Sequence, residues 1–220
     1  LKTAIIEMLS GTSVKINTAT FRNDIVNIQS KDDVLTYMIH LGYLGYDFSH
    51  KSVFIPNNEI RGEFVNAVSV SQWGEVSKAL KNSADLLNAI WRKDEEKVAV
   101  YMEQAHFETS HLQYNNENAL SYTVSLALYA ARNFYQVYRE FPSGSGFADI
   151  VYLPRKEFPD KPALIVELKW NKSAEGAIHQ ILKKQYFQNL EDYSGNMLLV
   201  GINYDLKTRK HECKILEFKK

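Results

Sequence analysis

Apolar and polar residues recur with a helical period over the first half of the chain. The segment KDDVLTYMIHLGYLGYD, residues 31–47, is the clearest example, because acidic residues occupy its first turn and Gly42 lies near its end. The same kind of pattern predicts one short strand, VFIP, and further helices over residues 57–69, 75–94 and 95–110. We therefore expect residues 1–112 to form a small α-helical domain.

The pattern changes after residue 113. A long helix is predicted over residues 117–135, and β-branched, aromatic and aliphatic residues then mark strands at 136–142, 147–154, 163–170, 196–205 and 211–218. One amphipathic helix, residues 173–190, separates the third strand from the fourth. A strand, helix, strand unit implies a right-handed crossover and a parallel pair. Residues 113–220 are therefore expected to be an α/β domain with a mixed sheet.

Composition narrows the classes of protein only a little. The 26 basic and 26 acidic side chains cancel, so the chain carries no overall charge that would steer it to nucleic acid or to an acidic membrane. A single cysteine, Cys213, excludes an intrachain disulfide and a zinc site built from thiolates, and this favours a cytoplasmic protein. No apolar run approaches the length needed to cross a bilayer.

Two ionisable side chains interrupt the most apolar of the predicted strands, PALIVELKW. The strand period of two sends Glu167 and Lys169 to the same face. Burying ionised groups costs several kcal/mol unless they are paired or coordinated. An acid-x-lysine triplet also occurs at Glu95, Asp205, Glu212 and Glu217, and such triplets are usually solvated. An ion pair on a half-exposed sheet face is therefore the structural alternative to a functional site.

A third ionisable residue lies in the strand of SGSGFADIVYL. If this strand is the antiparallel neighbour of the other, Asp149 and Glu167 become close neighbours across the two strands. Two adjacent carboxylates suit a divalent cation with hard oxygen ligands, Mg²⁺ or Mn²⁺, or else share one proton. Such an ion would stabilise the charge that develops on a phosphodiester and activate a water molecule, with Lys169 beside it as a positive charge.

These residues carry a resemblance to a known family. The motifs G-F-A-D at Gly146–Asp149, E-L-K at Glu167–Lys169 and A-I-H-Q-I at Ala177–Ile181 resemble the PD-(D/E)XK nuclease superfamily. The similarity is closest to the branch found at the C-terminal end of bacterial AAA-ATPase-like proteins. The resemblance implies a restriction-endonuclease-like α-β-β-β-α-β core and magnesium-dependent phosphodiesterase activity.

The resemblance also implies roles for individual residues. Asp149 and Glu167 would be metal ligands, Lys169 the catalytic lysine and Gln180 an auxiliary active-site residue. Glu117 matches an acidic residue on the first core helix, and Tyr186 matches an aromatic residue that follows the glutamine and would contact substrate. Phe147 departs from the pattern, because this position often holds an arginine.

The resemblance extends in weaker form to the first domain. Residues 1–112 are similar to a lid or winged-helix-like segment that joins the ATPase-like and nuclease parts in that branch. The chain has no P-loop motif, and it begins at Leu1 as if within a helix. The chain alone is therefore not expected to be a P-loop ATPase, and the resemblance implies an ATPase-like domain upstream on the same polypeptide.

Several other side chains have an ordinary structural role as the alternative to a functional one. Lys172, Lys183 and Lys184 flank the helix of Gln180 and are expected to meet substrate phosphates, although solvated lysines are the alternative. His106 and His111 are not spaced as ligands on one helix face, and His179 is expected at the rim of the site. Trp73 and Trp91 are expected in the core.

The sequence thus predicts a magnesium- or manganese-dependent endo- or exonuclease, with DNA as the expected substrate. The alternative is a regulatory module on the same fold that binds nucleic acid or protein without cutting.

Overall fold

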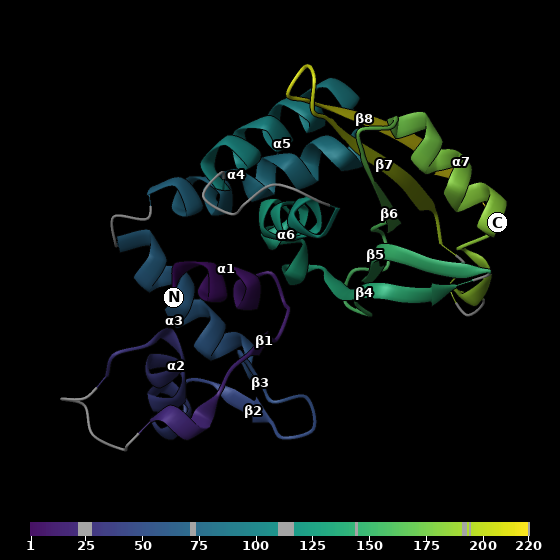
Figure 1. The fold of residues 1–220 in the computed structure, drawn as a ribbon. Coiled ribbons are helices and arrows are strands. Elements are labelled where there is room, and N and C mark those ends of the chain that lie inside the picture. The colour runs from purple at the N-terminus through teal and green to yellow at the C-terminus, as the bar shows by residue number, and fades with distance from the viewer. Residues whose placement is uncertain are drawn as a thin grey trace. The chain divides into compact units, whose positions relative to one another are not determined.

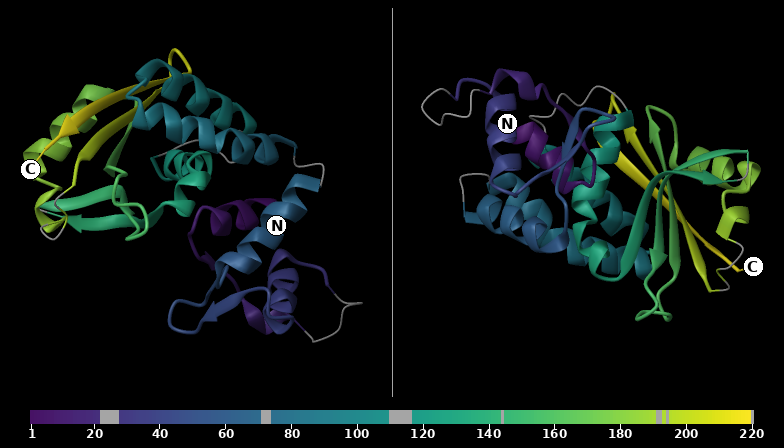
Figure 2. Two further views of the ribbon diagram at one scale, coloured as in Figure 1. Left: turned by 180° about the vertical axis from the view of Figure 1, so that it is seen from behind. Right: turned by 90° about the horizontal axis from the view of Figure 1, so that it is seen from below.

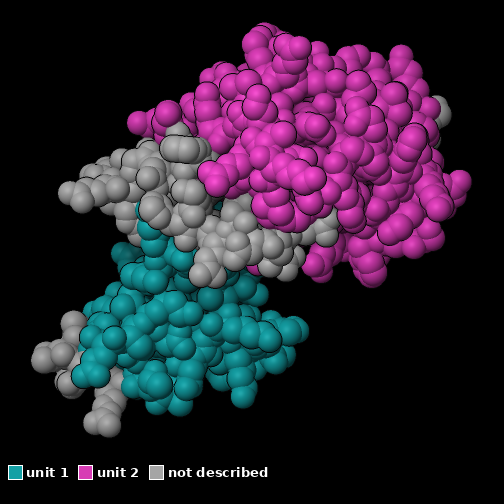
Figure 3. All heavy atoms as spheres, turned by 45° about the horizontal axis from the view of Figure 1, so that its top comes forward, with its two compact units in different colours: residues 1–77 teal, residues 78–220 magenta. Residues whose placement is uncertain are grey.

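The computed structural model describes residues 1–21, 28–70, 74–109, 117–143, 145–190, 193 and 195–219. The chain divides into two compact units, Leu1–Ser77 and Lys78–Lys220, which Figure 3 colours separately. The predicted boundary between residues 112 and 113 lies outside the described residues and stays a prediction. The second compact unit starts earlier than that boundary, because the helical residues 78–109 belong with the large sheet.

The first unit combines helices with a small sheet. Its elements are α1 (Lys2–Leu9), β1 (Val14–Lys15), η1 (Thr18–Thr20), α2 (Lys31–His40), β2 (Gly45–Asp47), β3 (Ser52–Phe54) and α3 (Asn58–Val70). The strands form an antiparallel sheet in the order β1-β3-β2. Strands β1 and β2 were not predicted, because two or three residues are too few to show a period of two.

Helix α2 begins where the sequence predicts but ends earlier. Ser30 and Asp33 form a capping box, in which each side chain accepts a hydrogen bond from the other residue's backbone N–H. The helix ends at His40, and Gly42 adopts a φ of 80° just beyond it. The predicted helix over residues 31–47 is therefore too long, and its last three residues form β2.

The second unit is built on a five-stranded sheet. Its helices are α4 (Gly74–Trp91), α5 (Glu95–Thr109), α6 (Glu117–Ala127), η3 (Tyr129–Asn133), α7 (Ala174–Lys184) and η4 (Gln188–Leu190). Helix α4 belongs to this unit from Lys78 onward. Its strands are β4 (Tyr135–Ser143), β5 (Gly146–Pro154), β6 (Ala163–Trp170), β7 (Met197–Asp205) and β8 (Lys210–Phe218). The predicted long helix is divided, because α6 ends at Ala127 and a 3₁₀ turn follows.

The strand order is β4-β5-β6-β7-β8, and β6 and β7 form the parallel pair. The remaining neighbours are antiparallel. From α6 onward, the elements follow the order helix, three strands, helix, two strands, so the predicted mixed α/β fold with its α-β-β-β-α-β core is confirmed.

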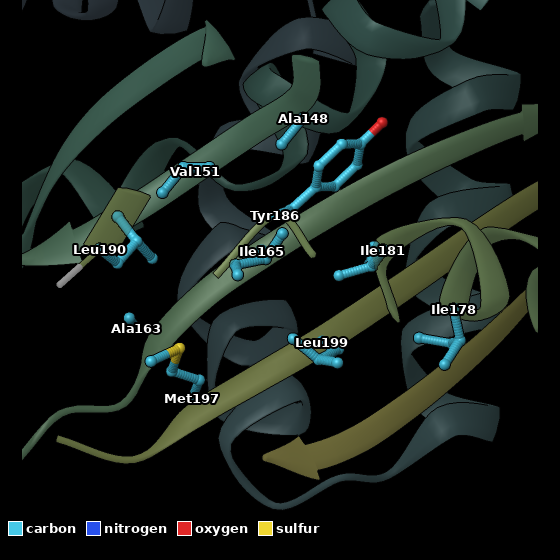
Figure 4. Close-up of a cluster of buried hydrophobic side chains, with 10 residues drawn as sticks. All are labelled: Ala148, Val151, Ala163, Ile165, Ile178, Ile181, Tyr186, Leu190, Met197 and Leu199. Atoms are coloured by element: carbon cyan, nitrogen blue, oxygen red, sulfur yellow. The ribbon is translucent and has the colours of Figure 1, made fainter. Parts of the chain in front are cut away.

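Helices cover both faces of the large sheet (Figures 1 and 2). Helix α7 packs on one face, against β6 and β7, and α5 and α6 pack on the other, against β8 and β6. Under α7 lies a buried apolar cluster that includes Ile165, Ile181 and Leu199 (Figure 4). A side chain at Gly201 would collide with the Ala174 carbonyl oxygen, so glycine allows α7 to approach β7 closely.

Helix α5 is joined to β8 by polar contacts as well as by packing. Glu95 accepts a hydrogen bond from the Ile215 backbone N–H at 2.9 Å and forms an ion pair with Lys214 at 3.1 Å. Further along, the rings of His106, Tyr204 and His211 lie within about 5 Å of one another, at centroid distances of 4.4, 4.9 and 5.1 Å. None of the described helices is both long and apolar enough to span a bilayer.

Candidate active site

The site forms where β5 and β6 stop pairing through their backbones. Their paired register runs from Tyr152 opposite Leu164 to Ile150 opposite Val166. At the next position the Leu168 N–H donates to the Asp149 carboxylate, Oδ2, at 2.7 Å. A side chain thus takes the place of a strand partner, and it anchors the Asp149 carboxylate beside β6.

Strand β6 brings the acid and the lysine of its triplet together. Lys169 Nζ lies 2.8 Å from Glu167 Oε1, although the two residues are only 2% and 7% exposed. Val166 and Leu168 alternate with them along the strand and are buried on the opposite face of the sheet. The ion pair of the structural alternative exists, but it is buried rather than half-exposed.

Helix α7 adds an amide to this pair. Gln180 Nε2 donates to Glu167 Oε1 and also lies 3.1 Å from the Tyr186 hydroxyl oxygen. The helix starts at a Ser173 cap, whose hydroxyl accepts the Gly176 N–H at 3.0 Å. Tyr186 is fully buried and supports Gln180 from within the cluster of Figure 4. Its predicted contact with substrate stays a prediction.

The two oxygens of Glu167 are unequal. Oε1 accepts from both Lys169 and Gln180, whereas Oε2 is buried and has no hydrogen-bond partner among the described residues. Burial, helped by the nearby charge of Asp149, raises the pKa of Glu167 to about 7, and Lys169 and Lys184 oppose this rise. An unsatisfied buried carboxylate oxygen costs free energy, which a bound cation or proton would recover.

The three predicted phosphate-binding lysines differ in placement. Lys184 lies at the end of α7, with its ammonium 5.8 Å from the centre of the Tyr186 ring. Gly146 leaves room for it, since a Cβ there would lie 3.2 Å from the Lys184 ammonium. Lys172 and Lys183 are exposed. Of the three, Lys184 therefore has the most direct influence on Glu167.

Several residues that the sequence analysis considered either lie away from this site or fall outside the residues that the structure describes. Glu117 begins α6, but its side chain lies outside the described part of the structure, as do His111 and Trp73. His106 is on the α5 face with His211, away from α7, and His179 is exposed. Among the described residues, no three His, Cys, Asp or Glu side chains gather as metal ligands. The metal-binding roles of Asp149 and Glu167 therefore stay predictions.

Two neighbouring residues were missed by the sequence analysis. Asn203 on β7 is fully buried opposite Lys169, and its side chain binds the Lys172 backbone N–H at 3.0 Å and carbonyl at 3.2 Å. It thereby fixes the turn between β6 and α7. Arg139 on β4 interacts electrostatically with Asp149 and donates to Ser121 Oγ at 2.6 Å. A polar residue inside the apolar segment MLLVGINYD was the available signal for Asn203.

Comparison with known proteins agrees with this geometry. A model of the PD-(D/E)XK nuclease superfamily matches residues 116–214, a range that contains β4 to β7 and every residue of the candidate site. The match suggests nuclease activity, and nucleases of this superfamily generally use divalent metal ions and act on nucleic acid. Comparisons with curated proteins and with solved structures gave no match.

Proposed function

We propose that this protein is a magnesium- or manganese-dependent nuclease that hydrolyses phosphodiester bonds, with DNA as its preferred substrate. One observation carries the proposal. Glu167 Oε2 is buried without a partner beside the Asp149 carboxylate, while Lys169 and Gln180 hold the other oxygen of Glu167. This arrangement suits a cation, because the ion pair with Lys169 uses only Oε1 and leaves the buried Oε2 free to act as a ligand.

The donor set fits a hard divalent ion. Carboxylate oxygens are the preferred ligands of Mg²⁺ and Mn²⁺, and Asp149 and Glu167 would supply them, with Glu117 as a further acidic residue of the site. When bound, such an ion stabilises charge on the phosphate and lowers the pKa of a coordinated water.

The residues of the chain would divide the remaining work. The Leu168 N–H holds Asp149, and Gln180 holds Glu167, so both carboxylates are oriented before substrate arrives. Lys169 carries a positive charge at 2.8 Å from Glu167, where it would orient the attacking water or stabilise the charge of the transition state. Lys184, with the exposed Lys172 and Lys183, would bind flanking phosphates.

Finer assignments belong to the same proposal. The motifs at Gly146–Asp149 and Glu167–Lys169 support the branch that follows bacterial AAA-ATPase-like domains, with such a domain as the partner. A cytoplasmic location is inferred from the single cysteine. The rival proposal, a module that binds without cutting, is less favoured because Asp149, Glu167 and Lys169 are all present and gathered.

The test is cleavage of single-stranded, duplex and branched DNA with Mg²⁺ or Mn²⁺, with and without chelator. Lys169→Met should lower the rate by about a hundredfold or more, because it removes a charge next to the reacting phosphate. Lys214→Met, which changes the lysine of the exposed triplet, is the matched control and should cleave normally. Metal binding without any cleavage would favour the binding module, and absence of metal binding would overturn the site.

A further inference from the structure

Strand β4 contains a backbone conformation that is unusual within a strand. Glu140 has a φ of 47°, in the left-handed region, whereas the other described non-glycine residues with a positive φ lie in turns or next to helix ends, as Lys51 and Arg209 do. Such a φ costs free energy in a residue that carries a Cβ atom, and it persists only where the surrounding structure imposes it. The segments on both sides of Glu140 must therefore impose this conformation.

The strand register places Glu140 opposite Asp149. The pairing of β4 with β5 passes from Arg139 to Phe141, and Glu140 and Asp149 are the facing residues between these paired positions. The same register holds on both sides, so no residue is inserted as it would be in a β-bulge. The pairing of β5 with β6 also ends beside Asp149, at Ile150. Both strand pairings thus change at the level of one carboxylate of the candidate site.

The two halves of β4 face opposite sides of the sheet. Arg139, before the left-handed position, contacts α6, since its guanidinium donates to Ser121 Oγ at 2.6 Å and lies 5.0 Å from the centre of the Tyr122 ring. Phe141, after that position, packs against the apolar cluster beneath α7, which covers the other face (Figures 1 and 2). A regular strand would send residues two apart to the same face. Strand β4 therefore changes face at Glu140.

Strand β5 changes face at the same level. Ala148 and Val151 both belong to the cluster beneath α7 (Figure 4), although residues three apart on a regular strand face opposite sides. Asp149 lies between them, and its Oδ2 accepts the Leu168 N–H at 2.7 Å. Because a strand N–H points along the sheet toward its neighbour, the carboxylate lies toward β6, where Glu167 is. The change of face thus brings the two carboxylates of the candidate site together.

We infer that Glu140 is a positioning residue for Asp149, and that its backbone conformation rather than its exposed carboxylate has this role. This role rests on the proposed nuclease function and adds a residue to it. The tip of the hairpin is held on the α7 side, where the Ser145 N–H donates to the Lys184 carbonyl at 3.2 Å. In a regular hairpin the register would bring Leu168 opposite the backbone of Ala148, and Asp149 would lose its hydrogen bond to Leu168.

Variants that differ in their tolerance of a positive φ test this role. Glu140→Gly and Glu140→Asn remove the carboxylate but accept the left-handed conformation. Crystal structures of both should keep the 2.7 Å hydrogen bond between Leu168 and Asp149, and their Mg²⁺-dependent rates of DNA cleavage should stay within about twofold of the parent. Because glycine relieves the cost of the positive φ, the urea midpoint of Glu140→Gly should equal or exceed that of the parent.

Glu140→Val should have the opposite effect, because a β-branched side chain resists a positive φ. Its crystal structure should lack the hydrogen bond between Leu168 and Asp149, and its cleavage rate at saturating substrate should fall about tenfold to a hundredfold, since Asp149 is displaced. Arg209 is the matched control, because it is exposed in the turn between β7 and β8 with a φ of 57°. Arg209→Val should lower the urea midpoint about as much as Glu140→Val but cleave within about twofold of the parent.

Three results would overturn the positioning role. These are a parent-like structure and rate in Glu140→Val, losses in Glu140→Gly and Glu140→Asn as large as that in Glu140→Val, and an equal loss of cleavage in Arg209→Val. If Glu140→Val does not fold, the glycine and asparagine variants still decide, because a loss of cleavage in both would assign the effect to the carboxylate, and retention supports the backbone role.

The two proposals fail separately. Cleavage that requires Lys169 but tolerates Glu140→Val would remove the positioning role alone. A chain that never cleaves, and in which only Glu140→Val loses the hydrogen bond between Leu168 and Asp149, would remove the nuclease alone.

Discussion

Strands β6 and β8 carry the same acid-x-lysine pattern in one sheet and use it differently. On β6, Glu167 and Lys169 are buried and contact each other and Gln180. On β8, Glu212 and Lys214 are exposed, and Lys214 forms an ion pair with Glu95 of α5. The triplet becomes a candidate for catalysis on β6, where the sheet buries it and the carboxylate of Asp149 lies nearby.

The difference has an energetic side. The exposed pair on β8 keeps most of its hydration, so it neither costs nor contributes much to stability. The buried pair on β6 loses its hydration and leaves Glu167 Oε2 unsatisfied. A strand that tolerates this cost without a compensating ligand would be unusual, and this is why the β6 triplet is the functional candidate.

The largest expected effect separates the two triplets by activity. Glu167→Gln should lower the rate of metal-dependent cleavage by about a thousandfold, since under the proposed function it removes a charged metal ligand from the site. Glu212→Gln should leave the rate within about twofold. Initial rates on labelled DNA measure both. Equal losses in the two variants would mean that burial does not distinguish the strands.

A second prediction concerns the pH dependence of stability contributed by β6. The pKa of Glu167 is raised to about 7 in the folded chain from an ordinary value of 4.5. Between these two pH values the folded chain keeps a proton on Glu167 that the unfolded chain has lost. The stability that this proton contributes is therefore fully present below pH 4.5 and is lost as the pH rises through about 7. Chemical unfolding in chelator should show a loss of about 1–3 kcal/mol over this window. Glu167→Gln should abolish that loss, and a parent-like profile in the variant would contradict the assignment.

Strand β8 should show the opposite sign. His211 is 5% exposed, neither ring nitrogen has a hydrogen-bond partner among the described residues, and burial lowers its pKa to about 3. Its neutral form is favoured in the folded chain, so its contribution is present above an ordinary pKa of 6.5 and lost as the pH falls through about 3. Acid unfolding of His211→Leu should begin at lower pH than that of the parent. His40→Leu, at an exposed histidine, is the control.

The smallest expected effect is at the exposed triplet itself. Lys214→Met should change the free energy of unfolding by less than about 1 kcal/mol, because Lys214 is exposed and its half-buried partner Glu95 keeps its bond to Ile215. Urea titration at two salt concentrations measures this effect. A change several times larger would mean that the ion pair between α5 and β8 is not screened by solvent.

The sequence predicts the parts of the site that depend on local pattern. Asp149, Glu167 and Lys169 were found because charged residues interrupt apolar strands, and the parallel pair followed from the strand, helix, strand unit. Gln180 and Tyr186 were found only through family resemblance, since their environment depends on how α7 crosses the sheet. Their roles in substrate or metal binding stay predictions.

Features that arise from contacts between distant segments were not predicted. The Asn203 clamp on Lys172 joins residues 31 positions apart, and the Glu95 bond to Ile215 joins residues 120 positions apart. Helix α5 itself was predicted, but the sheet face that it covers was not. An amphipathic pattern states that one face is buried and does not state what buries it.

The hydrogen bond from the Leu168 N–H to Asp149 Oδ2 has a consequence for amide exchange with solvent. Protection of this amide depends on a carboxylate rather than on a carbonyl of the neighbouring strand, so its exchange rate follows the state of one acidic side chain. The backbone signal of Leu168 in a nuclear magnetic resonance spectrum should therefore move when a divalent ion is added, before any substrate is present. A single amide thus becomes a reporter of how the carboxylates of the candidate site are engaged.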